Sequence, residues 1–151
     1  LAPIIIDCRQ EALLSKVSMV LYENLGEEYP EVLASIIRAL KSIFSALGVR
    51  LMTPKPAEIL LRLNPILRNR NELVQHACIE LVGMIANILP EAVSPREWMR
   101  ISFELIDVLK AQNRQVRRSA ILSFGQIAKA IGPQDVLIAL LNNLKVQERQ
   151  N

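Results

Sequence analysis

The sequence predicts an all-α protein in which helix pairs stack into a solenoid, and three observations support that fold class. Apolar residues recur with a period of 42 residues, as Val17, Ile59 and Ile101 illustrate. Within each period the apolar spacing is helical, and the composition is 51% hydrophobic but only 4% aromatic. An internal repeat near forty residues with helical periodicity is typical of stacked helix pairs. The other sets with this period are Leu21, Leu63 and Leu105; Leu25, Leu67 and Leu109; Val32, Val74 and Val116; Ile37, Ile79 and Ile121; Ile43, Ile85 and Ile127; and Leu47, Leu89 and Ile131.

The first predicted pair covers residues 9–48, with helices near 9–25 and 30–47. Gly26 and Gly48 follow the two helix ends. Glycine just past a helix end can adopt the left-handed backbone that terminates the helix. The glycines therefore support both boundaries.

The second predicted pair covers residues 53–90, with helices near 54–69 and 72–89. Pro90 ends the second of these helices. Pro65 lies in the middle of the first predicted helix, where it removes one backbone hydrogen bond. We therefore expect Pro65 to bend that helix.

The third predicted pair covers residues 94–132, with helices near 95–111 and 113–131. Ser94 precedes the first helix and Glu97 follows three residues later, which is the pattern of a capping box. The 151 residues thus hold about three and a half repeats, because a half repeat follows at 133–151. Its helix, near 134–149, would leave an apolar face without a partner helix, formed by Val136, Leu137, Leu140, Leu141 and Leu144. This unpaired face predicts that the chain is a single segment of a longer array.

Two glycines, Gly83 and Gly125, occupy equivalent positions well inside predicted helices. A glycine in a helix interior costs about 1 kcal/mol relative to alanine. Its recurrence predicts that a neighbouring helix approaches closely at this position. Trp98, which starts the first helix of the third pair, is interpreted as a packing residue between repeats rather than a platform for base stacking.

The sequence offers little support for an enzyme, a cofactor site or a metal site. The single histidine, His76, is two residues from Cys78, a spacing that places them on different sides of a helix. No CxxC, HExxH, glycine-rich phosphate loop or nucleophile elbow occurs. No uncharged run approaches the roughly 20 residues that cross a bilayer, so we predict no membrane segment. Cys8 and Cys78 are interpreted as free thiols of a cytosolic or nuclear protein.

The strongest candidate for binding is a stripe on the last complete helix, made of Arg114, Arg117 and Ile121. These residues follow the spacing i, i+3 and i+7, so they line one side of the helix beside its buried stripe. Residues 113–151 carry six Lys and Arg against two Asp and Glu. Two arginines at a helix N-terminus oppose the helix dipole, and cations beside free backbone N–H groups favour an anion such as phosphate. The alternative is a structural role, in which an arginine binds a neighbouring repeat.

Several stretches of the chain closely resemble one family. They are LGEEYPEVL (25–33), PILRN (65–69), REWMRISFEL (96–105), RRSAILSFGQIAKAIGPQDVL (117–137) and LLNNLKVQERQ (140–150). They resemble the large HEAT-repeat subunit of splicing factor 3b, over nearly the whole chain from about Val20. The resemblance implies a HEAT-repeat α-solenoid.

The resemblance also implies a function, which we state as an expectation. The chain would be a non-enzymatic scaffold segment of the nuclear U2-type small nuclear ribonucleoprotein, helping to form the pocket for the branch-site adenosine in pre-mRNA splicing. Arg114, Arg117, Ile121 and Leu109 match the positions of that pocket. The implied partners are small nuclear RNA, intron branch-site RNA, other splicing factor 3b subunits including a small PHD-finger-like zinc protein, and splicing-modulator compounds.

The chain departs from the family pattern within this same segment. Asn113 and Arg114 stand where lysines are common, Ile121 where valine is common, and Gln126 where an aromatic residue is common. These changes put sensitivity to modulator compounds in doubt more than RNA binding. A function of another class is a protein-only HEAT scaffold, of the nuclear transport receptor or phosphatase scaffold type.

Overall fold

The structure is a computed structural model that describes residues 8–48, 52–132, 134, 137–138 and 141–142. The described residues form helices and turns and contain no strand. The helices are α1 (Cys8–Glu23), α2 (Pro30–Leu47), α3 (Pro56–Ile66), α4 (Glu72–Ile88), the short 3-10 helix η2 (Pro90–Ala92), α5 (Pro95–Val108) and α6 (Arg114–Ile131). None of these helices combines the length and the apolar character needed to cross a membrane.

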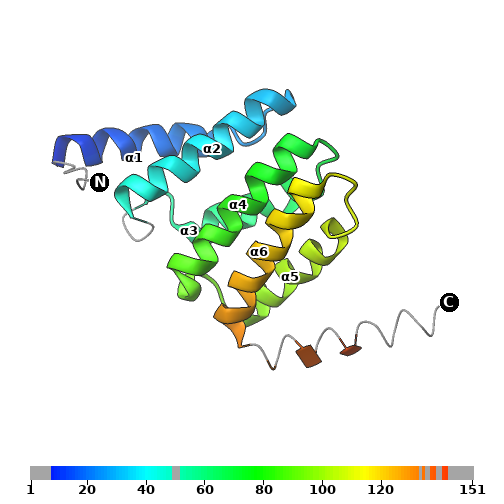
Figure 1. Cartoon of the computed structure of the whole chain (residues 1–151). Helices are drawn as coiled ribbons and strands as arrows, with labels where there is room; N and C mark the ends of the chain where they lie inside the picture. The colour runs from blue at the N-terminus through cyan, green and yellow to red at the C-terminus, as the bar shows by residue number, and fades with distance from the viewer. Residues whose placement is uncertain (1–7, 49–51, 133, 135–136, 139–140, 143–151) are drawn as a thin grey trace, which may run out of the picture.

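The helices are arranged as stacked pairs, which confirms the predicted fold class. Helices α2, α4 and α6 lie side by side in one layer, where α4 packs against both of the others (Figure 1). Each of them also packs against the helix that precedes it, α1, α3 or α5. The described part of the chain is therefore an α-solenoid built mainly on contacts between the second helices of successive pairs.

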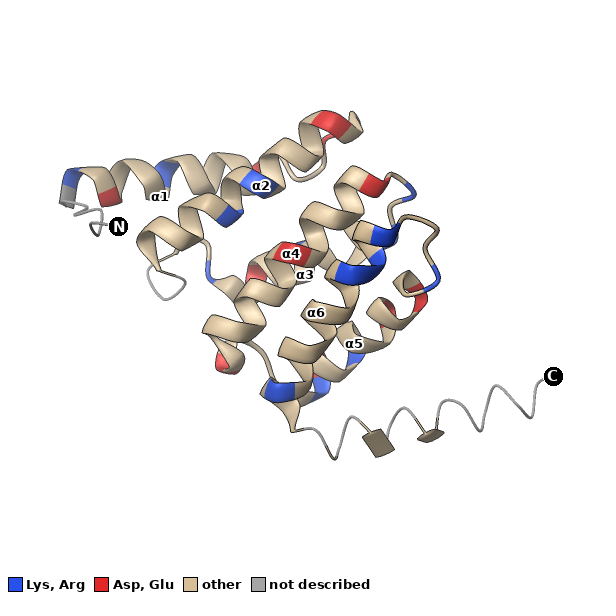
Figure 2. Ribbon diagram, viewed as in Figure 1, with Lys and Arg blue, Asp and Glu red and all other residues tan. Residues whose placement is uncertain are grey.

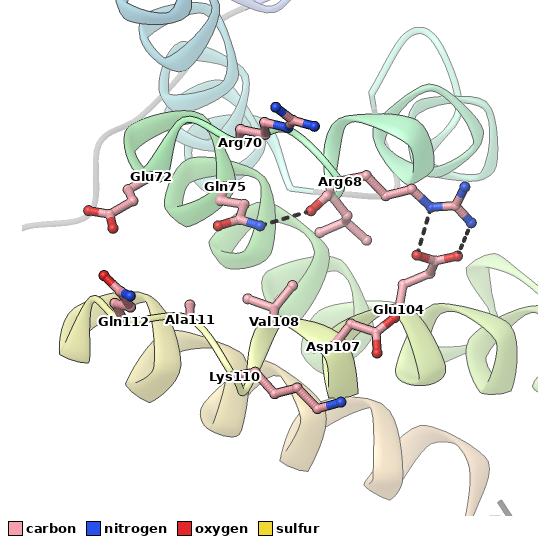
Figure 3. A pocket seen from close by; sticks show the side chains of 11 residues that line it. Arg68, Arg70, Glu72, Gln75, Glu104, Asp107, Val108, Lys110, Ala111 and Gln112 are labelled. Atoms are coloured by element: carbon pink, nitrogen blue, oxygen red, sulfur yellow. Dashed lines mark hydrogen bonds and ion pairs between the residues drawn. The ribbon is translucent and has the colours of Figure 1, made fainter. Parts of the chain in front are cut away.

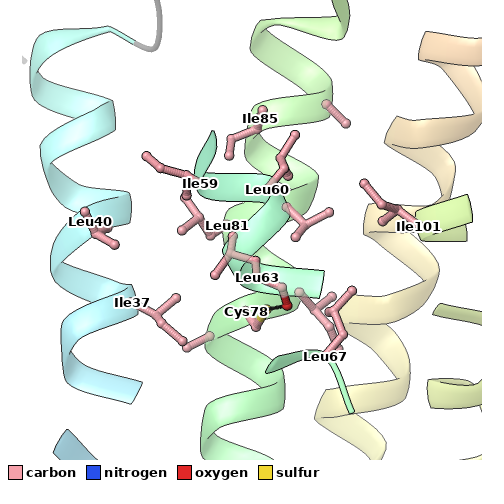
Figure 4. Packing of buried hydrophobic residues seen from close by; sticks show 14 of the residues in the cluster. Ile37, Leu40, Ile59, Leu60, Leu63, Leu67, Cys78, Leu81, Ile85 and Ile101 are labelled. Atoms are coloured by element: carbon pink, nitrogen blue, oxygen red, sulfur yellow. Dashed lines mark hydrogen bonds between the residues drawn. The ribbon is translucent and has the colours of Figure 1, made fainter. Parts of the chain in front are cut away.

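The core runs through this layer and is made largely of Leu, Ile and Val side chains. Figure 4 shows Ile37 and Leu40 on α2 directed toward the residues of α3 and α4. Among the residues with the 42-residue period, Ile59 and Ile101 are fully buried, or nearly so, whereas the equivalent Val17 is 41% exposed. Val17 lies on α1 at one end of the described stack, where one side of the helix has no described neighbour. The exposure of Val17 thus reflects its place at this end of the described stack.

Helix α3 ends earlier than the sequence predicts, and the prediction of a bend at Pro65 is wrong. The helix runs from Pro56 to Ile66, so the proline lies in its last turn and not in its middle. Beyond it the chain continues as a turn, in which the Asn69 N–H donates to the Ile66 carbonyl (2.9 Å). Proline has no N–H and crowds the preceding turn, which favours termination over a bent continuation.

The two recurrent glycines have different surroundings. A Cβ atom on Gly83 would overlap the Ser123 hydroxyl and lie 2.9 Å from Ser123 Cβ. The predicted close approach is therefore confirmed at Gly83, where α6 crosses α4. At Gly125 the prediction is wrong for the described residues, because a Cβ atom there would meet no atom within 4 Å. No further helix is stacked on that side of α6 in the described part of the chain.

Other expectations are confirmed at the start of α5. Trp98 is fully buried, and its indole Nε1 donates to the Pro90 carbonyl (2.7 Å), as expected of a packing residue. The Ser94 hydroxyl accepts from the Glu97 N–H (3.3 Å), which is one half of the predicted capping box. The last predicted helix, 134–149, lies mostly outside the described residues.

Candidate nucleic-acid interface

The N-terminus of α6 is fixed by the side chain of Asn113. Its Oδ1 accepts from the backbone N–H groups of Gln115 (2.8 Å) and Val116 (3.3 Å), as expected for a residue that caps a helix. Its Nδ2 donates to Glu72 Oε2 at the start of α4 (2.8 Å). Asn71, one period earlier, caps α4 in the same way. The starts of the two helices are therefore built alike and are tied to each other.

Arg117 contacts the turn between α5 and α6, which comprises residues 109–113. Its Nη1 donates to the carbonyl oxygens of Ala111 (2.6 Å) and Gln112 (2.7 Å). At the equivalent position on α4, Gln75 Nε2 donates to the Leu67 carbonyl (3.3 Å), in the turn between α3 and α4. The side chain at this position therefore holds the preceding turn in both repeats, which is the structural alternative that the sequence leaves open.

Arg114 is exposed at the first position of α6, and Arg118 is exposed one turn further along. Among the described residues, neither arginine forms an ion pair. Glu72, which occupies the position of Arg114 one period earlier, accepts a hydrogen bond from the neighbouring repeat. A cation at this position cannot accept such a bond. The neighbour that Arg114 suits is therefore an acceptor or an anion.

Ile121 is 61% exposed, whereas Ile37 and Ile79, its equivalents on α2 and α4, are fully buried. The backbone carbonyl of Ile79 accepts from the Ser123 hydroxyl of α6 (2.9 Å), so α6 lies directly over that position. Ile121 therefore lies on the side of α6 that corresponds to the side of α4 on which α6 packs. Leu122 beside it is equally exposed.

The structure brings only part of the predicted pocket together. Arg117 is bonded to the turn that begins at Leu109, and Leu109 itself is partly buried against the core. Arg114 and Ile121 lie on α6 with exposed side chains. The predicted buried stripe of α6 is confirmed: Val116, Ala120 and Ile127 are buried, and Phe124 and Ile131 are partly buried.

Charge distinguishes α6 from the helix next to it. Helix α6 carries three arginines and one lysine and no acidic residue. Helix α4 carries two glutamates and neither lysine nor arginine. Figure 2 shows basic residues of α6 at its N-terminal end, beside the two turns that link the helices of each pair, whereas Lys129 lies in the last turn of the helix. This end of the described stack is therefore the one that favours an anion.

A second feature of this end could not be predicted from the sequence. An open cavity of about 590 Å³ lies between the α3–α4 turn and the α5–α6 turn (Figure 3). At one side of it Arg68 forms two hydrogen bonds to Glu104, with Nε 3.0 Å from Oε2. The hydrogen bonds from Arg68 lower the pKa of the Glu104 carboxyl. Since the partners are 36 residues apart, Arg68 in the α3–α4 turn and Glu104 on α5, no spacing rule would have paired them.

The cysteine of α4 lies in the core, and its histidine lies beside a glutamate of the same helix. The Cys78 thiol is fully buried and free, and burial raises its pKa. His76 Nε2 lies 3.1 Å from Glu80 Oε1, and Lys41 Nζ of α2 lies 2.7 Å from Glu80 Oε2. No group of His, Cys, Asp or Glu side chains among the described residues could hold a metal ion. The side chain of Cys8 lies outside the described residues.

Comparison with known proteins identifies close relatives. No family model matches the chain. It is 62% identical over 144 residues to the U2 snRNP component prp10 of Schizosaccharomyces pombe, covering 95% of this chain and 12% of that protein. It is 51% identical over 143 residues to the U2 snRNP component HSH155 of Saccharomyces cerevisiae, covering 95% of this chain and 15% of that protein. The chain thus spans only a small part of the length of these relatives.

Over nearly all of its length, the chain is similar to one stretch of two U2 snRNP components, which confirms the resemblance to the large HEAT-repeat subunit of splicing factor 3b.

Proposed function

We propose that the chain is a non-enzymatic segment of a nuclear U2-type splicing scaffold and that α6 helps to form the pocket for the branch-site adenosine. In this proposal the repeats at 9–48, 53–90 and 94–132, with the half repeat at 133–151, are part of a longer solenoid. Small nuclear RNA and intron branch-site RNA are its nucleic-acid partners. Other splicing factor 3b subunits, including a small PHD-finger-like zinc protein, are its protein partners. Splicing-modulator compounds would compete for the same pocket.

The observation that carries the proposal is that one helix has both an arginine without an ion-pair partner among the described residues and an exposed apolar side chain. Arg114 is exposed at the N-terminus of α6, where the positive end of the helix dipole also favours a phosphate. Ile121 is exposed two turns further along, where the equivalent residues on α2 and α4 are buried. A phosphate beside Arg114 and a base beside Ile121 would match the polar and apolar parts of a nucleotide. Leu109 and Arg117 would complete the wall from the α5–α6 turn.

The experiment that tests this proposal is crosslinking of branch-site RNA to the assembled complex. We expect the double substitution Arg114→Ala with Arg117→Ala to weaken crosslinking and to impair splicing. The matched control is Gln75→Ala, which changes the residue of α4 equivalent to Arg117, a residue whose side chain donates to the α3–α4 turn, and should leave both readouts close to those of the unmodified complex. Unchanged crosslinking and splicing in the Arg114 and Arg117 variant would exclude these residues from the RNA site.

The second candidate is a protein-only HEAT scaffold, and the Arg117 contact favours it in part. Because Arg117 binds backbone carbonyls, one of the two predicted cations already has a structural use. Nuclease treatment followed by co-purification separates the two candidates. Loss of small nuclear RNA association after substitution on α6 supports the RNA site, whereas nuclease-resistant retention of all partners supports the protein-only scaffold.

A further inference from the structure

We infer that Arg117 is a positioning residue: it holds the α5–α6 turn and thereby places Arg114, while Arg114 makes the contact with phosphate. This inference rests on the proposed RNA site and assigns different tasks to two arginines that the sequence pattern treats alike. It makes the turn at residues 109–113 part of the binding machinery.

The contacts of Arg117 carry the first step. One guanidinium nitrogen, Nη1, donates to two successive carbonyl oxygens, those of Ala111 and Gln112, at 2.6 and 2.7 Å. The last carbonyl groups of a helix and the turn that follows lack partners within the helix, and a cation near them interacts favourably with the helix dipole. Arg117 is thus directed at the turn that follows α5, although it belongs to the first turn of α6.

The equivalent residue on α4 shows that this task does not require a charge. Gln75 uses a neutral amide to donate to the Leu67 carbonyl of the α3–α4 turn (3.3 Å). Both side chains are half-buried against the turn they hold. The fold therefore uses this position to secure a turn. The positive charge of Arg117 strengthens that contact, because hydrogen bonds from charged donors are stronger than neutral ones.

The turn in question determines where Arg114 lies. It ends at Asn113, whose Oδ1 caps α6 and whose Nδ2 is bonded to Glu72 of α4. Arg114 is the next residue and the first of α6. If the turn loosens, the cap and the first helical residue move with it. Loss of the Arg117 contact should therefore weaken RNA binding without removing a contact to phosphate.

The salt dependence of RNA binding separates these roles. Each phosphate contact to a duplex contributes about 0.9 to the slope of log affinity against log salt concentration. In the assembled complex, with a branch-site duplex as probe, we expect Arg114→Ala to weaken binding and to reduce the slope by about one. Arg117→Ala should weaken binding about fivefold with no change in slope. Arg117→Gln, which installs the side chain found on α4, should restore both affinity and slope to near their original values.

Hydrogen exchange in the same complex without RNA provides an independent readout. We expect Arg117→Ala to accelerate exchange at the capped N–H groups of Gln115 and Val116, and Arg117→Gln to restore protection. A slope reduced by about one in both Arg117 variants would overturn the inference, since it would show a phosphate contact. Unchanged exchange in Arg117→Ala would overturn it too. If Arg114→Ala changes neither affinity nor slope, the proposed RNA site fails, and exchange still decides whether Arg117 holds the turn.

Discussion

Helices α4 and α6 occupy equivalent places in successive repeats. Helix α4 is packed between α2 and α6, whereas α6 packs against a second helix of a pair on one side only in the described part of the chain. Both begin at a capping asparagine, Asn71 or Asn113. Both follow a turn that is held by the residue four positions after the cap. They differ in charge, since α4 carries two glutamates where α6 carries four basic residues and no acid. The comparison separates what the fold requires from what has been added to it.

Features shared by the two helices are therefore structural, and features confined to α6 are candidates for function. The cap and the turn contact belong to the first class. The cation at the position of Glu72 and the exposed isoleucine at the position of Ile79 belong to the second. Arg117 belongs to both, because its contact is shared while its charge is not.

The largest expected contrast concerns the periodic isoleucines. Ile79→Ala should lower the free energy of unfolding by about 2–5 kcal/mol, because the side chain is fully buried and its removal leaves a cavity. Ile121→Ala should change it by less than about 0.5 kcal/mol, because the side chain is exposed. Denaturant unfolding monitored by helical circular dichroism measures both. Equal effects of the two substitutions would mean that Ile121 is as buried as its equivalent.

A somewhat smaller contrast is expected at the glycines. Gly83→Ala places a methyl group against Ser123 and should cost about 1–3 kcal/mol of stability by overpacking. Gly125→Ala meets no atom within 4 Å and should stabilise α6 by up to about 1 kcal/mol through helix propensity. Hydrogen exchange of the α4 and α6 amides reports each effect locally. Destabilisation by both changes would indicate that a neighbour also packs on Gly125.

The losses of stability on replacing the two capping asparagines should differ by less. Replacement of either residue by alanine removes a helix cap, which costs about 1 kcal/mol. Asn113→Ala should cost more than Asn71→Ala, because only Asn113 also donates to the preceding repeat, at Glu72 Oε2. The effect of Glu72→Ala on the Asn113→Ala background, measured as a double-mutant cycle, isolates that hydrogen bond. A coupling energy of zero would show that the bond does not link the repeats.

The smallest effect is a dependence on pH at the cavity between the turns. Arg68 lowers the pKa of Glu104 below its ordinary value of 4.5. The pair therefore stabilises the fold above that value, and the contribution is lost as pH falls through the lowered pKa. Because the Arg68 side chain is 73% exposed, we expect a small change in the thermal midpoint between neutral pH and about pH 3. In Arg68→Met this part of the pH dependence should disappear, and its persistence would rule out Arg68 as the cause.

The fold could be predicted from the sequence because the apolar residues that form the core recur with a fixed period. Residues such as Ile59 and Ile101 repeat a buried environment, so the spacing alone identifies stacked helix pairs. The end of α3 could not be predicted because a helix can either bend at a proline or end there. The outcome depends on the turn bonds that follow Pro65, such as that of Asn69.

The candidate site could be predicted only in part. Helical spacing placed Arg114, Arg117 and Ile121 on one side of α6, but it could not reveal that Arg117 is turned toward the carbonyls of Ala111 and Gln112. It also could not pair Arg68 with Glu104. Contacts between turns depend on how two helix pairs are oriented, and the period of a sequence carries no information on that orientation.

The central claim is that a local exchange of charge on a shared scaffold creates the RNA site. Its most direct test is the swap Glu72→Arg with Arg114→Glu, which leaves the net charge of the chain unchanged. Glu72→Arg alone serves as the control for tolerance of the scaffold. We predict that the assembled complex with the swap loses retention of branch-site RNA and that its binding becomes less dependent on salt, while the control retains RNA. Retention of RNA by the swapped complex with an unchanged salt dependence would contradict the claim.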